Sequence, residues 1–362
     1  MMKNINIILF LTLVFAEPFE GLTLISGRNG SETLIINNDN DTLNIWDTIS
    51  TSLNTICYLN SDSTLICPQA KLNATNQGGG LYIKYDWDSN ILWDYELPDS
   101  ICLPHHDISI LPNGNILSIC TEYKNIDEVQ NMGYVSEIDS SFGFDMIIEI
   151  EPIGIDSASI VWEWKSSDHL MQDIDSDLQN YGIVADHPEL LDINMPTDGS
   201  STLDWLHSNC VSYNEDLDQV VISSRFTSEF YVIDHSTTIE ESLSHTGGIY
   251  GKGGDILYRW GNPQNYDRGT GQDKILGAQH GVDWIPQGYP GEGNFLLFNN
   301  HHEFYGSNNP NSRSAVMEIE PPINMDGSYN IESENSFAPE TYLWSYQDDF
   351  FSNFQSGAFR LP

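Results

Sequence analysis

Basic residues are scarce in this sequence. It has 13 Lys+Arg against 53 Asp+Glu, a formal net charge of −40 over 362 residues. A nucleic-acid-binding protein needs lysine and arginine to neutralise phosphates, so the composition predicts no nucleic-acid partner. The same shortage argues against binding to an anionic membrane surface, and we attribute the acidity to solubility. Because cations are few, an arginine inside a motif is more informative than usual.

Cysteine is also sparse, and no two cysteines have the CxxC spacing of a zinc site. Cys57 and Cys67 flank YLNSDSTLI, which we predict to be a hairpin. The two thiols could therefore form a disulfide across the hairpin or remain free, and the sequence leaves both possibilities open. The other three cysteines are Cys102, Cys120 and Cys210.

Long apolar runs are confined to the N-terminus. A single Lys3, an apolar run from Ile5 to Phe15 and then Ala16 are typical of a secretory signal, so we predict a signal peptide over 1–16 and a secreted or periplasmic location. The run is too short to span a bilayer comfortably. A buried first strand is the alternative interpretation. If residues 1–16 are a signal peptide, residues 17–362 form the functional domain.

Helical periodicity is rare, and the best helix candidate is the segment 168–182, DHLMQDIDSDLQNYG. Elsewhere, short runs rich in Ile, Val, Tyr, Trp and Thr are bounded by Gly, Asn, Asp and Pro, which is typical of strands and turns. The sequence therefore predicts an all-β fold.

An apolar strand with a tryptophan recurs five times, and each copy leads to a second strand. The copies are LNIWDT (Trp46), NILWDYEL (Trp93), SIVWEWK (Trp162), DILYRWG (Trp260) and TYLWSYQ (Trp344). Five units of short antiparallel strands with insertions of different length favour a β-propeller over a sandwich. The wider gaps between tryptophans hold either long loops or an additional blade.

Three of the second strands carry a histidine at what looks like one position. His106 lies six residues before Pro112, His207 six before Tyr213 and His280 six before Pro286; the other two copies have Asn54 and Ser356 there. Equivalent positions of successive blades meet around the axis of a propeller, so we expect the three imidazoles to lie together. Strand positions that fill a core usually hold Val, Ile or Leu, which favours a site over a structural role.

Two chemistries fit three imidazoles. Catalytic zinc uses such a set, but the sequence shows no carboxylate that would orient the imidazoles, since Asp107 should point away from His106. The other chemistry is nucleophilic catalysis by histidine assisted by cations. Arg225 follows the His207 hairpin on the returning strand, and Asn209 shares the strand face of His207, although a solvated surface arginine remains the alternative.

Several motifs together resemble the PAPS-independent arylsulfate sulfotransferases. They are HHDISILPNGNIL, DWLHSN, SSRF, YVIDH, GGDILYRWGNP, QHGVDWIP, GNFLLFNN, SRSAVMEIEP and SGAFRLP, and they run in order from about Gly80 to the end of the chain. The resemblance implies an exported six-bladed propeller that moves a sulfuryl group from one phenol to another. Its partners would be small aryl sulfates and phenols, with no cofactor and no metal.

The resemblance also implies roles for individual residues. His280, in the QH motif, would be the nucleophile that becomes transiently sulfated. The other site residues would be His106 (rather than its neighbour His105), His207, Asn209 and Arg225. Arginine and hydrogen-bond donors suit the charge that develops on sulfuryl oxygens, and an imidazolium can protonate a departing phenolate.

The sequence departs from the family pattern at both ends. The first tryptophan unit begins soon after the predicted signal, where familiar bacterial members have an additional β-domain, so dimerisation that depends on that domain is in doubt and the oligomeric state stays open. The chain ends at SGAFRLP, which we interpret as a last blade truncated at the C-terminus. A non-catalytic propeller that binds ligands or partners is the alternative function, and hydrolysis of sulfate esters is a third possibility.

One glycine-rich segment resembles a phosphate-binding loop without matching it. GGIYGKGG (Gly247 to Gly254) is one residue short of a Walker A loop and lacks the Ser or Thr after Lys252. We therefore interpret it as a flexible loop before the Trp260 strand.

Overall fold

The computed structural model describes residues 19–362 except 27–31, 49–55, 72–78, 138–140 and 200. The predicted signal peptide lies outside the described residues, so it stays a prediction. Among the described helices, none is long and apolar enough to cross a membrane.

Five antiparallel sheets contain most of the regular secondary structure in the described chain. In order they are β1 (Thr23–Ser26), β2 (Glu32–Ile36) and β3 (Thr42–Asp47); β4 (Tyr58–Leu59), β5 (Leu65–Ala70), β6 (Gly80–Tyr85) and β7 (Ile91–Glu96); β8 (Leu103–Ile110), β9 (Ile116–Asn125), β10 (Ser141–Ile153) and β11 (Ser157–Lys165); β14 (Ser208–Asn214), β15 (Gln219–Ser224), β16 (Glu229–Asp234) and β17 (Tyr258–Trp260); and β18 (His280–Trp284), β19 (Phe295–Glu303), β20 (Arg313–Ile319) and β21 (Trp344–Tyr346). Within each sheet, consecutive strands pair with one another.

Little else in the described chain is regular. β12 (Leu170–Met171) and β13 (Leu191–Asp192) form a short parallel pair. The helices are α1 (Ile126–Asn131), α2 (Ile239–Ser242) and three 3-10 turns, η1 (Ser166–Asp168), η2 (Val184–Asp186) and η3 (Pro263–Tyr266).

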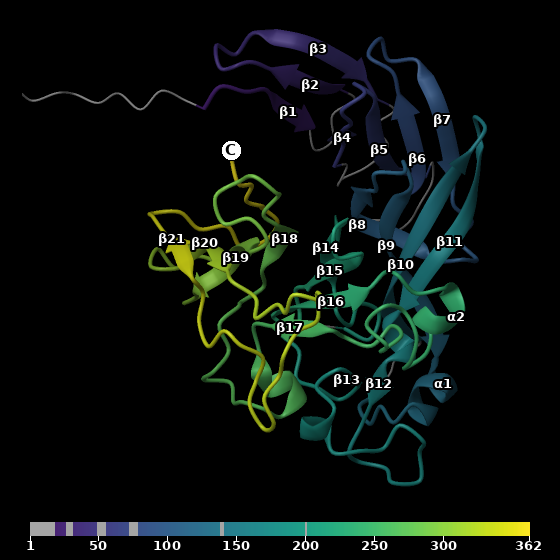
Figure 1. The fold of residues 1–362 in the computed structure, drawn as a ribbon, viewed down its shortest axis with the longest axis vertical. Helices are drawn as coiled ribbons and strands as arrows, with labels where there is room; N and C mark the ends of the chain where they lie inside the picture. The colour runs from purple at the N-terminus through teal and green to yellow at the C-terminus, as the bar shows by residue number, and fades with distance from the viewer. Residues whose placement is uncertain (1–18, 27–31, 49–55, 72–78, 138–140, 200) are drawn as a thin grey trace, which may run out of the picture.

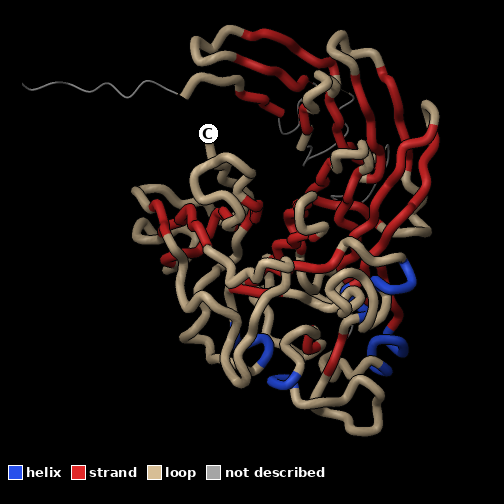
Figure 2. Tube along the Cα trace, in the orientation of Figure 1, coloured by secondary structure: helices blue, strands red, loops and turns tan. Residues whose placement is uncertain are grey.

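The five sheets follow one another around a common centre, with strands β8, β14 and β18 on the inside (Figures 1 and 2). This arrangement confirms the all-β propeller. It does not confirm six blades, because the described residues form five. After β21 the chain continues to Pro362 without a further strand, so SGAFRLP does not adopt the strand expected from its similarity to the other copies.

The apolar core lies between neighbouring sheets. Ile119 and Ile147 of the third sheet, for example, are fully buried in one cluster with Val220 and Ile233 of the fourth. The opposite face of the third sheet packs Ile116 and Ile148 against Ile66 and Tyr82 of the second sheet. The third sheet is thus apolar on both faces, as a propeller requires.

The recurring tryptophan stands in the outermost strand of each sheet and joins it to the next sheet. The indole Nε1–H donates to a group at or beside the connection between the last two strands of the following sheet. The pairs are Trp46 with Asp86 O (2.8 Å), Trp93 with Ser157 O (2.8 Å), Trp162 with Thr237 Oγ1 (2.9 Å) and Trp260 with Pro339 O (2.7 Å). Those four tryptophans are buried, whereas Trp344 of the fifth sheet is 45% exposed. The repeat is therefore a contact between blades.

Replacing Trp162 by phenylalanine is expected to destabilise the fold by about 2 kcal/mol, because the change removes a buried hydrogen bond and leaves a small cavity. Urea denaturation followed by tryptophan fluorescence measures this. Trp344→Phe is the matched control at the same strand position; it should change the free energy of unfolding by less than about 0.5 kcal/mol. Equal effects of the two substitutions would contradict a role for the tryptophan between blades.

The helix predicted over 168–182 is wrong. The segment contains β12 and turns, because the Gln172 side chain accepts from the backbone N–H groups of Ile174 and Asp175 at 2.8 and 2.7 Å. Such side-chain bonds to nearby backbone groups compete with a helix.

The cysteines behave differently from one another. Cys57 and Cys67 form a disulfide, which decides between the two possibilities that the sequence left open. Cys102, Cys120 and Cys210 are free and buried.

Candidate active site

The histidines of the second strands lie on the inner strands of three consecutive sheets. His106 is in β8, His207 directly precedes β14, and His280 begins β18. Strand β14 lies between β8 and β18 and contacts both. The fold thus brings together side chains that are more than a hundred residues apart in the sequence.

The hairpin ladders correct the predicted register for His207. The last pairs before the turns are Leu111 with Asn115, Asn214 with Gln219, and Ile285 with Asn294. Counting back five residues from the first member of each pair gives His106, Asn209 and His280. His207 is seven residues before Asn214, two residues earlier than Asn209. The prediction was wrong because Tyr213 still belongs to strand β14, whereas Pro112 and Pro286 already belong to turns.

All three inner strands are distorted where these residues lie. The ladders shift register between Pro104 and Ile108, between Ser208 and Cys210, and between His280 and Asp283. His106 and His207 have φ of 57° and 53°, in the left-handed region. Bulges and positive φ re-aim side chains and are common next to functional sites.

The hydrogen bonds of His280 define its tautomer. Its Nδ1 lies 3.0 Å from Ala278 O and 2.7 Å from Asn300 Oδ1. The Asn300 amide nitrogen donates to Ser352 O and Gln355 O, so its oxygen faces the imidazole as an acceptor. Nδ1 therefore carries the proton. The lone pair is on Nε2, which accepts a hydrogen bond of 3.1 Å from the backbone N–H of Gln355.

The surroundings of His280 keep it neutral. Burial lowers its pKa to about 4; the bond to Asn300 opposes this shift, and the charge of Arg225 adds to it. A neutral imidazole with its lone pair on Nε2 is the nucleophilic form of histidine at that atom.

His106 and His207 contact each other at 4.6 Å between ring centroids. His106 also lies 2.8 Å from His105, Nδ1 to Nδ1. Burial, followed by the charges of His105 and His207, holds the pKa of His106 well below its usual range, so His106 is neutral. Of the adjacent pair, His106 is the residue that touches His207.

His207 is paired with a carboxylate that the sequence did not point to. Its Nδ1 lies 2.5 Å from Asp204 Oδ2. Burial raises the pKa of Asp204, but the hydrogen bond and charge of His207 outweigh burial and lower it. Asp204 is therefore ionised and holds the His207 ring in place through this hydrogen bond.

Arg225 is fixed beside His207, since its backbone N–H donates to His207 O at 3.2 Å. Its guanidinium lies over the Phe226 ring, and its Nε is buried without a hydrogen-bond partner in the described part of the chain. Burial lowers the pKa of Arg225 below its usual value, and a guanidinium still stays charged. An orphaned donor on a cation suits an anionic ligand.

Asn209 lies in the bulge of strand β14 and contacts Gln279, the residue before strand β18. Its Nδ2 donates to Gln279 O at 2.8 Å. Its Oδ1 is buried and has no hydrogen-bond partner among the described residues. This oxygen is therefore available to accept a hydrogen bond from a ligand hydroxyl.

Asp107 takes no part in this cluster, in agreement with the strand alternation. It accepts from the Tyr58 hydroxyl at 2.5 Å and from Val211 N at 3.3 Å. Burial raises its pKa to about 6.

Sequence reasoning missed Asn300 and Asp204. Asn300 stands in GNFLLFNN and Asp204 in DWLHSN, two of the motifs that carry the family resemblance. Their partners, His280 and His207, are twenty and three residues away in sequence. The motifs could have drawn attention to both residues, but only the fold shows what they bind.

The fold and this cluster define a β-propeller whose inner strands hold a neutral histidine, a histidine paired with a carboxylate, and an arginine. The arylsulfotransferase (ASST) profile matches residues 23–358. The chain therefore belongs to the arylsulfotransferase family, a family of sulfotransferase enzymes.

Similarity to individual proteins is weak. No curated protein matches the chain. A protein of unknown function from Bacteroides caccae is 11% identical with a TM-score of 0.41, over 90% of this chain and 72% of that one. Virginiamycin B lyase from Staphylococcus aureus is 11% identical with a TM-score of 0.36, over 82% and 77% of the two chains. Likenesses this low carry no information about function.

Proposed function

We propose that this protein transfers a sulfuryl group from an aryl sulfate to a phenol through Nε2 of His280, without PAPS. The observation that carries the proposal is the tautomer of His280: the proton is held on Nδ1 by Ala278 and Asn300, and burial keeps the ring neutral. Membership of the arylsulfotransferase family supplies the substrate class.

The first half-reaction forms a sulfohistidine. The Nε2 lone pair attacks sulfur and an N–S bond forms. The ester bond between sulfur and the phenolic oxygen breaks, and its electron pair stays on that oxygen, which leaves as phenolate. The imidazole gains positive charge in this step. Its Nδ1–H already donates to Ala278 O and Asn300 Oδ1, so these two oxygens stabilise that charge.

The departing phenolate needs a proton, and we assign its delivery to His207. The hydrogen bond from Asp204 orients the His207 ring, as carboxylates do for catalytic imidazoles. In the second half-reaction the acceptor phenol returns a proton to His207 while its oxygen attacks sulfur. The N–S bond then breaks and its electron pair returns to Nε2.

The remaining residues bind the group in transit. Arg225 offers its charge and unpartnered Nε–H to the sulfuryl oxygens. His106 is neutral and adds an imidazole next to His207. Asn209 Oδ1, which has no partner among the described residues, accepts a hydrogen bond from the acceptor hydroxyl as the phenol binds, before that hydrogen passes to His207. The backbone N–H of Gln355 must release Nε2 before His280 attacks.

Mass spectrometry tests the proposal. The protein is incubated with 4-nitrophenyl sulfate, quenched in base, digested and searched for a sulfated peptide containing His280. Sulfation there, removed by adding phenol, supports transfer between phenols. Sulfation that decays equally fast without phenol indicates hydrolysis, and nitrophenyl sulfate that binds without release of nitrophenolate indicates a non-catalytic propeller.

The proposed nucleophile predicts an unusual pH profile. Only the neutral imidazole attacks, so kcat/KM for the aryl sulfate should stay high as pH falls through 6.5 and halve at about pH 4. The unfolded chain protonates His280 near pH 6.5 and the folded one near 4, so the stability linked to this residue is also lost across that window. Circular dichroism at each pH is therefore the control. A midpoint near 6.5 with intact fold would contradict the assignment.

We also propose that the chain is exported, as the N-terminal pattern predicts. The Cys57–Cys67 disulfide supports this, because disulfides persist in oxidising compartments. N-terminal sequencing of the protein recovered from its native host tests it, and a mature chain that retains residues 1–16 would contradict it.

A further inference from the structure

Three side chains with metal-binding atoms meet at a place that shares no residue with the candidate active site. They are His169, His245 and Asp255, and one ligand atom from each lies within 4.8 Å of the others; no other group of this kind occurs among the described residues. Nδ1 of His169 lies 2.8 Å, and Nδ1 of His245 2.7 Å, from the same oxygen, Oδ1 of Asp255. Asp255 directly follows the glycine-rich segment 247–254.

The tautomer of His169 is set by its second nitrogen. Nε2 lies 2.9 Å from the backbone carbonyl of Ser242, which can only accept, so Nε2 carries the proton. In the neutral ring, the Nδ1 lone pair then faces the carboxylate oxygen of Asp255. Two acceptors at 2.8 Å repel each other unless a cation lies between or beside them.

Protein packing holds His169 in this orientation. The ring is fully buried and stacks on Trp164 at 5.7 Å, with 3° between the planes. Trp164 Nε1 donates to Gly254 O, which ties the glycine-rich segment to the same place. A Cβ on Gly254 would lie 2.0 Å from Ser242 O, so only glycine fits there. A histidine whose other N–H is bound to a backbone carbonyl is a frequent arrangement for metal ligands.

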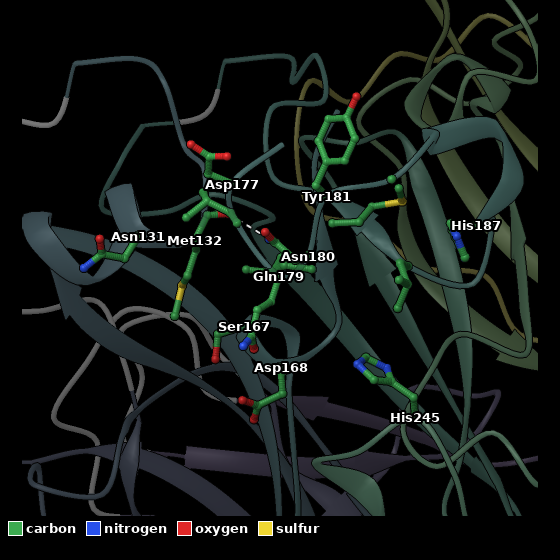
Figure 3. Close-up of a pocket in the computed structure, with 15 residues that line it drawn as sticks. Asn131, Met132, Ser167, Asp168, Asp177, Gln179, Asn180, Tyr181, His187 and His245 are labelled. Carbon is green, nitrogen blue, oxygen red and sulfur yellow. Dashed lines mark hydrogen bonds between the residues drawn. The ribbon is translucent and has the colours of Figure 1, made fainter. Parts of the chain in front are cut away.

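The third ligand faces an open space. The His245 side chain is 59% exposed and lines a cavity of about 720 Å³ together with His187 and Asp168 (Figure 3). Metal and water can therefore reach the site from that cavity. Two imidazoles and one carboxylate with a position left for solvent are a ligand set that Zn²⁺ accepts.

We propose that His169 Nδ1, His245 Nδ1 and Asp255 Oδ1 bind a divalent transition metal of the Zn²⁺ class, with the cavity side open for water. Bonds of about 2.0–2.2 Å in tetrahedral geometry require the ligand atoms to separate slightly from their present spacing. His245 can move to allow this, because it is exposed. Such an ion would join β12, the turn after α2 and the start of β17 from one point.

Co²⁺ titration of the full chain, stripped of metal with a chelator, tests the proposal. Visible absorption of four-coordinate Co²⁺ should saturate at one ion per chain, and Zn²⁺ should displace the signal. His245→Ala should weaken Co²⁺ binding at least about 100-fold, because even the loss of an outer-shell partner weakens binding 10- to 100-fold. Asp255→Asn should also weaken binding, and it keeps the shape of the side chain.

His187→Ala is the matched control. His187 lines the same cavity and is about as exposed, but it pairs with Glu189 outside the cluster. Its substitution should leave the Co²⁺ titration unchanged. The proposal is overturned if the unmodified chain binds neither Co²⁺ nor Zn²⁺. Hydrogen bonds from protonated imidazoles would then account for the contacts of the two histidines with Asp255. Equal loss of binding in His187→Ala and His245→Ala would also overturn it, because the metal would then lie elsewhere in the cavity.

Discussion

His280→Ala is expected to lower kcat/KM for 4-nitrophenyl sulfate by at least about 10⁴-fold, the scale seen when a covalent nucleophile is removed. Alanine has no lone pair to attack sulfur, so no sulfated enzyme forms and the acceptor phenol has nothing to attack. The measurement is the initial rate of nitrophenolate release with phenol present. The variant should keep the fold, because the removed ring is held by hydrogen bonds to only a few neighbours.

His187→Ala serves as the control for that experiment as well. His187 is exposed, is paired with Glu189 and lies outside the inner strands. Its removal should leave the rate unchanged. If His280→Ala retains more than about a tenth of the activity, the sulfuryl group does not pass through His280, and the histidines of the inner strands only line a binding site.

Glu229→Gln is expected to destabilise the fold by about 3–5 kcal/mol, because it leaves a buried guanidinium without its counter-charge. Glu229 and Arg259 are both fully buried and form two parallel bonds, Nε to Oε1 at 2.9 Å and Nη2 to Oε2 at 2.6 Å. Arg259 also donates to Leu190 O. Urea denaturation measures the loss.

Two further variants make the result specific. Asp349→Asn breaks the pair with Arg313, in which Asp349 is exposed, and should change stability by less than about 0.5 kcal/mol. Replacing both Glu229 by Gln and Arg259 by Met should restore most of the loss, because no unpaired charge remains. Failure of the double variant to recover stability would mean that the pair acts by packing and not by charge.

The ion pair also supports the candidate site. The backbone carbonyl of Glu229 accepts from Gln279 Nε2 at 2.7 Å, and Gln279 O accepts from Asn209. Gln279 directly precedes His280. A destabilised Glu229 variant should therefore also lose activity under conditions in which it remains folded.

Much of the fold was predictable because it depends on local patterns. Alternating apolar residues, turn residues and a recurring tryptophan specify short strands whatever their neighbours are. Each recurring tryptophan lies in a strand, as predicted, and the structure shows that this strand is the last one of its sheet. The helix over 168–182 failed for the opposite reason: the Gln172 side chain bonds to nearby backbone groups, and apolar spacing does not reveal such bonds.

Register and partners were harder to predict. Counting back from a turn placed His106 and His280 correctly relative to their hairpins, but misplaced His207 by two residues. Its strand runs on to Asn214, and a tyrosine at 213 gives no sign of this. The two residues that hydrogen-bond to these histidines, Asn300 and Asp204, are polar side chains in motifs, and nothing local shows which histidine each one binds.

The sequence by itself determined the all-β propeller, the family resemblance that the profile match confirms, and the residue types available for chemistry. Strand patterns and motifs are properties of the chain alone. Only the tertiary structure decided that His280 holds its proton on Nδ1, that His207 is paired with Asp204, and that His169, His245 and Asp255 meet. The reason is physical: a proton's position and a metal-binding geometry depend on atoms within a few ångströms, and those atoms reach these distances only when the chain has folded.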